Sequence, residues 1–174
     1  MRGIAAFFVL LLALPGAAAT ARDDSEIQHW LNQHAQRAHG VEVAAARLRV
    51  VGDLDGDGRD DVAVLYTLKP RAASRGESRY LAVFKRERRG ARDNTHGRAE
   101  ERRGSLRYHA HALVSGPGAG EANRATILNR TVAVEMLTFK PGDAPCCPTH
   151  ASTRRYRLAA RGLTLMPDTA KKAR

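Results

Sequence analysis

The sequence predicts an α+β protein in which an N-terminal helix precedes an antiparallel β-meander of about six to eight strands. Two observations support this fold class. Apolar residues recur with helical spacing over 27–35, and the chain beyond Val41 consists of short alternating runs separated by Gly, Pro and Asn. The chain has 174 residues, enough for a leader and one domain with its own hydrophobic core.

The first residues indicate export. Arg2 precedes an unbroken apolar run over 4–14, and a turn and small residues follow. This pattern is typical of a signal peptide over 1–19, with cleavage expected after Ala19 or Ala21. Because the apolar run is shorter than the roughly 20 residues that span a bilayer, we expect no membrane span and a periplasmic or secreted protein.

A helix is predicted from Asp23 to about His39. Its apolar residues share one face: Ile27, Trp30, Leu31 and Ala35. The acidic residues Asp23 and Asp24 suit its positive N-terminal end. Eight runs then predict strands within one domain over 22–168: 47–51, 62–68, 80–84, 106–114, 125–128, 132–139, 155–158 and 163–165. Asn129-Arg130 lies between two of them and predicts a tight hairpin.

Positive charge is concentrated in the middle of the chain, whose formal net charge is +11. Thirteen Lys and Arg residues against five Asp and Glu lie between Lys69 and Arg107. Within that region, residues 86–104 have almost no apolar side chains and predict a basic mobile insertion. A solvated insertion is favoured over a contact with a polyanion. Nucleic acid is not an expected partner because the insertion lacks aromatic residues for base stacking. Residues 169–174 predict a flexible basic tail.

The strongest functional signal is an aspartate-rich turn between two predicted strands. Asp53, Asp55 and Asp57 alternate, Gly58 follows, and Asp61 comes three residues later. Calcium prefers about six to eight oxygen ligands, and closely spaced carboxylates can supply several of them. The spacing therefore predicts a calcium site with side-chain ligands from all four aspartates and a backbone carbonyl from Arg59.

The turn is not an EF-hand, because that motif needs a bidentate Glu at its twelfth position between two helices. Val64 occupies this position, in a predicted strand. The spacing instead resembles the calcium turns of integrin-type (FG-GAP-like) β-propeller repeats, although one copy does not imply a propeller. Magnesium or manganese, and a metal-free hairpin satisfied by Asx-turns and Arg59, remain alternatives. If calcium binds, we expect it to hold the loop in shape.

Cys146 and Cys147 are adjacent and are the chain's two cysteines. Export would place them in an oxidising compartment, where a vicinal disulfide is the favoured interpretation. Such a bond closes no long loop and so lacks the usual entropic stabilisation. Free or intermolecular thiols are a second interpretation. A soft-metal or redox site with His150 is a third, and His109 or His111 could supply a further ligand.

Several segments together resemble uncharacterised exported proteins and lipoproteins of bacteria, which carry an early Asp-Gly-Asp-Gly turn and a late Cys-Cys-Pro motif. The matching segments are 53–61, 80–84, 106–112, 143–148 and 155–158. The resemblance implies an exported α+β protein and supplies no activity.

The sequence contains no Gly-x-Ser-x-Gly motif, and His109 and His111 are expected on one face of a strand. We therefore expect a non-enzymatic, calcium-binding structural or binding protein, whose partner could be an envelope protein or a polyanion. The alternatives are a periplasmic thiol- or metal-handling protein that uses the vicinal cysteines, and an inhibitor or polyanion-binding module that uses the basic insertion.

Overall fold

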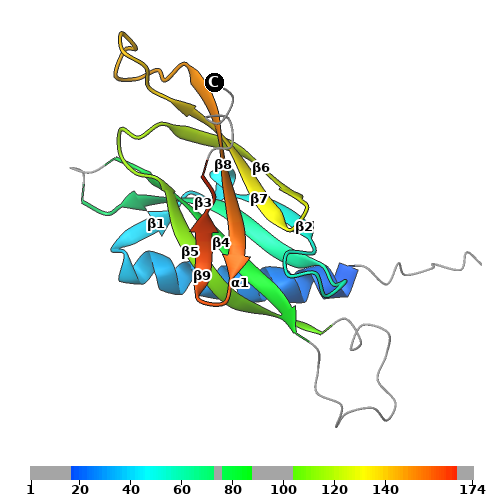
Figure 1. The fold of residues 1–174 in the computed structure, drawn as a ribbon. Coiled ribbons are helices and arrows are strands. Elements are labelled where there is room, and N and C mark those ends of the chain that lie inside the picture. The colour runs from blue at the N-terminus through cyan, green and yellow to red at the C-terminus, as the bar shows by residue number, and fades with distance from the viewer. Residues whose placement is uncertain (1–16, 73–75, 88–103, 168–174) are drawn as a thin grey trace, which may run out of the picture.

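The structure is a computed structural model that describes residues 17–72, 76–87 and 104–167. Over these residues, helix α1 (Ala17–Arg37) is followed by nine strands in two antiparallel sheets (Figure 1). The predicted α+β fold with an N-terminal helix is confirmed. Most of the predicted signal peptide and the basic tail lie outside the described residues. The two predicted cleavage points fall near the start of α1.

The first sheet, sheet A, contains five strands: β1 (Gly40–Glu42), β2 (Leu48–Gly52), β3 (Asp61–Pro70), β4 (Ser78–Glu87) and β5 (Ser105–Ser115). Strands β1 and β2 both pair with β3, one at each end of it. The short 3-10 helix η1 (Ala44–Ala46) separates them. Strand β1 is the one that the sequence patterns did not predict.

The second sheet, sheet B, has the order β6 (Glu121–Leu128), β7 (Thr131–Thr138), β8 (His150–Ala159) and β9 (Gly162–Leu165). Asn129 and Arg130 join the first two strands, and their φ angles are 50° and 59°. Two left-handed residues at the centre of a two-residue loop define a type I′ turn, which matches the twist of the flanking strands. The predicted hairpin is confirmed.

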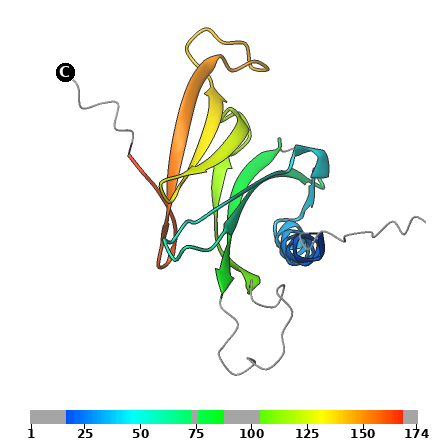
Figure 2. The same cartoon turned by 90° about the vertical axis from the view of Figure 1, so that its right-hand side faces the viewer.

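Sheet A is covered on both faces, by α1 on one side and sheet B on the other (Figure 2). Strand β3 lies at the centre, and every residue from Asp61 to Leu68 is buried. Its side chains alternate: Val62, Val64, Tyr66 and Leu68 pack in the core with α1, whereas Ala63 and Leu65 pack in the core with sheet B. This two-sided burial explains why β3 is almost continuously apolar.

The helix packs on sheet A through the apolar face that the spacing of its apolar residues predicts. Ile27, Trp30, Leu31 and Ala35 are all buried against sheet A. An ion pair also attaches the helix to the sheet, because the guanidinium of Arg86 in β4 donates to both carboxylate oxygens of Asp23, at 3.2 and 2.6 Å. Arg86 and Glu87, which were predicted to begin the basic insertion, are instead the last two residues of β4, because they pair with Leu106 and Ser105 of β5. Of the rest of the predicted basic insertion, Gly104 is described, and residues 88–103 lie outside the described part of the chain.

Candidate metal site

The aspartate-rich turn connects β2 to β3 at one end of sheet A. Gly56 and Gly58 have φ angles of 84° and 77°, a left-handed conformation that glycine adopts without steric cost. The guanidinium of Arg130 lies against Gly56, where a Cβ atom would come within 2.3 Å of Cζ. Gly58 is thus needed for the bend of the turn. Gly56 is needed both for the bend and for the close approach of the Arg130 guanidinium.

Three of the four predicted side-chain ligands come together in this turn. Asp53, Asp55 and Asp61 each offer one carboxylate oxygen, and these oxygens lie within 4.8 Å of one another. Among the described residues, this is the one group of three or more His, Cys, Asp or Glu side chains found in such an arrangement. The turn can therefore hold a metal ion, and the chemistry of three carboxylates favours a hard cation.

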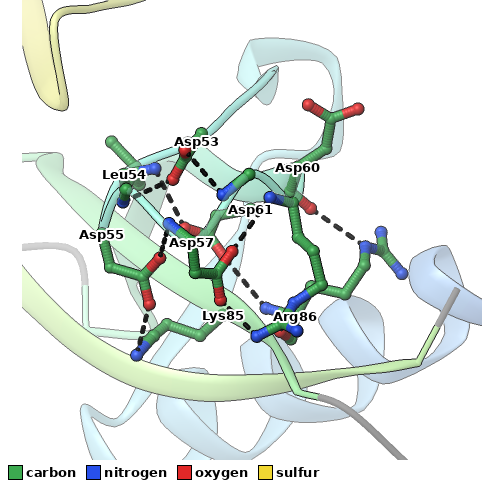
Figure 3. A network of polar contacts seen from close by, with 11 residues as sticks. Asp53, Leu54, Asp55, Asp57, Asp60, Asp61, Lys85 and Arg86 are labelled. Carbon is green, nitrogen blue, oxygen red and sulfur yellow. Dashed lines mark hydrogen bonds and ion pairs between the residues drawn. The ribbon is translucent and has the colours of Figure 1, made fainter.

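Asp57, the fourth predicted ligand, lies outside this group. Its carboxylate forms an ion pair with the guanidinium of Arg59 and accepts the Arg59 N–H at 2.9 Å. The carboxylate of the neighbouring Asp60 points away from the three acidic side chains (Figure 3). The predicted contribution of the Arg59 carbonyl stays a prediction.

Backbone N–H groups hold two of the clustered carboxylates in position. Asp53 accepts the N–H of Gly56 at 2.6 Å and that of Gly58 at 3.0 Å. Asp61 is fully buried and accepts the N–H of Leu54 at 3.0 Å and that of Arg86 at 2.9 Å. These bonds fix the direction of both side chains.

The surroundings act differently on the three carboxyl groups. Desolvation acts to raise the pKa of Asp53, but the N–H donors of the turn outweigh it and leave the pKa below its ordinary value. The hydrogen bond from Lys85 holds the pKa of Asp55 below its ordinary value. Burial raises the pKa of Asp61, against the effect of its two N–H donors. A bound dication would favour the charged form of all three carboxylates.

Lys85 and Arg86 of β4 are the neighbours that sequence analysis missed. The ammonium of Lys85 lies 2.6 Å from a carboxylate oxygen of Asp55, and Arg86 donates its Nε–H to the Asp60 carbonyl at 2.9 Å (Figure 3). Both residues reach the turn because Phe84 pairs with Val62 in the β3–β4 register. Lys85 supplies positive charge where a metal would bind, so a metal must compete with it for Asp55.

The cysteine turn, residues 139–149, joins β7 to β8 at the end of sheet B. Cys146 and Cys147 form a vicinal disulfide, and both residues are exposed. Asp143 organises the turn, because its carboxylate accepts the N–H groups of Lys140 and Thr149, each at 2.9 Å. Within the described part of the chain, no Cys or His side chain joins a metal-binding group of three or more.

The two histidines of β5 do not share a face, contrary to the prediction. The β4–β5 register shifts between Val83, which pairs with Ala110, and Phe84, which pairs with Tyr108. The intervening His109 is therefore unpaired. Its Nε2 lies 3.2 Å from the carbonyl oxygen of Ala159 in sheet B. His111 instead faces α1, so the β-bulge has reversed the expected alternation.

His111 joins an aromatic cluster between α1 and sheet A. Its ring centroid is 4.6 Å from that of His34, and the Nδ1 atom of His34 lies 2.8 Å from the hydroxyl of Tyr66. Trp30 stacks on His34 and on the half-exposed Tyr108. Burial lowers the pKa of His34 to about 4, and the nearby His111 and Arg37 act in the same direction. His34 is therefore neutral at neutral pH.

Comparison of the chain with protein-family models, curated proteins and solved structures found no match. The predicted resemblance to exported bacterial proteins is thus supported only by its two motifs, the acidic cluster and the vicinal cysteine pair. None of the helices described in the structure is long and apolar enough to cross a membrane.

Proposed function

We propose that this chain is an exported, non-enzymatic protein that binds a calcium ion in the β2–β3 turn, and that the ion stabilises the turn. The approach of three carboxylate oxygens to within 4.8 Å carries this proposal. Asp53, Asp55 and Asp61 would be the side-chain ligands. Oxygen ligands in an irregular, partly open cage suit calcium better than magnesium, which demands octahedral geometry.

Thermal unfolding with and without calcium tests this proposal. A dissociation constant of about 0.1–1 mM is usual for extracellular modules, so 10 mM calcium should raise the Tm by about 3 to 10 °C. Asp55→Asn should lose most of this shift. Asp60→Asn is the matched control, because it changes the same chemistry in the same turn at a carboxylate that points away. An equal shift in wild type and Asp55→Asn would contradict the proposal.

Lys85→Met provides a test with the opposite sign. The substitution keeps much of the aliphatic stem and removes the ammonium that pairs with Asp55. Calcium should then bind several-fold more tightly, because it no longer displaces a competing cation. Calorimetric titration measures this change directly, and unchanged or weaker binding in Lys85→Met would contradict the use of the Asp55 carboxylate by calcium.

Export is tested separately by the mass of the mature protein. Cleavage after Ala19 or Ala21 predicts two defined masses, and it would place Asp23 in the first turn of the mature helix, where an acidic side chain is favourable. A protein recovered from the cytoplasm with its N-terminus intact would contradict export and leave the calcium proposal untouched.

A further inference from the structure

A cleft of about 390 Å³ lies between the C-terminal part of α1 and strand β5. The volume lies in the range of small-molecule sites, about 300–1,000 Å³. Aromatic rings form most of its wall, and no carboxylate is among its described lining residues. The helix supplies Trp30, His34, Arg37 and Ala38, and the strand supplies Tyr108 and His111.

Arg37 supplies the positive charge of this cleft. It lies two turns after Trp30 and one turn after His34, so the three side chains share the face of α1 that meets β5. Its Nε donates to the Gln33 carbonyl at 3.3 Å, and its two terminal nitrogens have no partner among the described residues. The charge of the guanidinium acts to lower the pKa of four rings of the aromatic cluster: His34, Tyr66, Tyr108 and His111.

The nearby carboxylate that acts on the same cluster is already paired. Glu42 acts to raise the pKa of Tyr66, but Arg47 donates to both of its carboxylate oxygens, each at 2.6 Å. The two imidazoles of the cleft are neutral at neutral pH, because burial lowers the pKa of each. An anion in the cleft would therefore meet one cation and no competing carboxylate from the described lining.

The buried Tyr66 decides which nitrogen of His34 carries the proton. Tyr66 is fully buried, and the partner of its hydroxyl among the described residues is His34 Nδ1, at 2.8 Å. A buried hydroxyl needs an acceptor for its hydrogen, so Tyr66 donates to Nδ1. The proton of the neutral imidazole is therefore on Nε2. This atom has no hydrogen-bond partner among the described residues and is not fully buried, so His34 presents an N–H donor to the cleft.

We propose that this cleft binds a small aromatic carboxylate. The carboxylate would accept hydrogen bonds from the Arg37 guanidinium and the His34 Nε2–H, and the ring would contact Trp30 and Tyr108. A monoanion matches the single positive charge, and the forked N–H donors of a guanidinium suit a carboxylate. Contacts between aromatic rings add attraction beyond the area that they bury. The site goes beyond the proposed calcium function and shares no residue with the acidic turn.

Fluorescence titration tests the site directly, because Trp30 is the chain's single tryptophan and lines the cleft. The probes are benzoate, acetate and benzyl alcohol, in EDTA at pH 7. Benzoate should bind at least about ten-fold more tightly than acetate, which lacks the ring, and than benzyl alcohol, which lacks the charge. The proposal is overturned if benzoate changes nothing at millimolar concentration, or if either of the other probes binds as well as benzoate.

Matched variants separate the cleft from the general positive charge of the protein. Arg37→Gln removes the guanidinium at an exposed position of the last helical turn, where the fold tolerates the change. The control Arg155→Gln removes the same charge from an exposed residue of β8 that does not line the cleft. Benzoate should bind at least about five-fold more weakly to Arg37→Gln and within about two-fold of wild type to the control. Equal losses in the two variants would show non-specific attraction and overturn the proposal.

Two further measurements test the roles of the charge and of the donor. Arg37→Lys keeps the charge and loses the fork, so it should recover part of the affinity that Arg37→Gln loses, and no recovery would overturn the proposal. Nitrogen NMR of the imidazoles identifies the tautomer of His34 without any ligand. Nε2 should carry the proton, and its signal should move when benzoate is added. A proton on Nδ1 would leave no donor facing the cleft and would also overturn the proposal.

Discussion

The acidic turn and the cysteine turn are both shaped by an aspartate, yet they relate differently to the rest of the molecule. Asp53 accepts two backbone N–H groups of its own turn, and Asp143 does the same in the other. The acidic turn, however, also contacts β4 through Asp55, Asp61 and the Asp60 carbonyl. The cysteine turn extends beyond the end of sheet B (Figure 1), and its polar contacts are internal.

The difference shows what makes a local motif a candidate site. Internal hydrogen bonds give both turns a defined shape. Only the acidic turn places a buried carboxylate, Asp61, beside exposed ones and brings cationic side chains from another strand to the same place. Substitutions in the acidic turn should therefore lower the stability of the whole fold, whereas substitutions in the cysteine turn should alter only the structure of that turn.

The largest expected effect follows from removing the aspartate that bridges the acidic turn and β4. Asp61→Ala leaves the buried N–H groups of Leu54 and Arg86 without an acceptor, and should cost about 2–4 kcal/mol of unfolding free energy. Asp143→Ala should cost less, because water can replace an exposed acceptor. Urea unfolding in EDTA measures the unfolding free energy of both variants. An equal or larger loss in Asp143→Ala would contradict the proposed difference between the two turns.

A smaller loss of stability is expected when His34 is protonated. This residue of α1 faces His111 of β5, so the pair lies between the helix and sheet A. His34 faces His111, Tyr66, Tyr80 and Arg37, and its folded pKa is about 4 against an ordinary 6.5. The unfolded chain therefore binds the proton first, and stability should fall as the pH drops from about 6.5 to about 4. Because the side chain is only half-buried, the loss should be about 1 kcal/mol.

His34→Gln isolates this contribution. Glutamine can still bond the Tyr66 hydroxyl but does not titrate, so the variant should lose less stability than wild type between pH 7 and pH 4.5. His29→Gln is the control, since His29 is an exposed residue of the same helix. Thermal unfolding at several pH values measures the slope, and identical slopes in wild type and His34→Gln would refute the assignment.

The smallest effect is expected at the vicinal cysteines. Their bond joins neighbouring residues and closes no chain loop, so reduction releases little chain entropy. The variant Cys146→Ser/Cys147→Ser, or reduction of the wild type, should change the unfolding free energy by less than about 0.5 kcal/mol. A loss as large as that of Asp61→Ala would show that the cysteine turn supports the fold after all.

Local patterns predicted much of the fold and part of the site. The spacing of Ile27, Trp30 and Leu31 identified the buried helix face, and Asn129-Arg130 identified the hairpin, because helical periodicity and turn chemistry are local properties. The three-residue strand β1 is too short for an alternating pattern. The bulge at His109 was missed because a register shift depends on the partner strand.

The sequence by itself determined the helix, the alternation of the strands and the position of the acidic turn. It did so because aspartate spacing, glycine and apolar periodicity act over a few residues. Only the tertiary structure decided that Asp57 pairs with Arg59, that Lys85 reaches Asp55, and that Arg130 lies against Gly56. The last two contacts depend on strand pairing and on the packing of one sheet against the other. Electrostatic interactions act through such distances in space, which separation along the chain does not reveal.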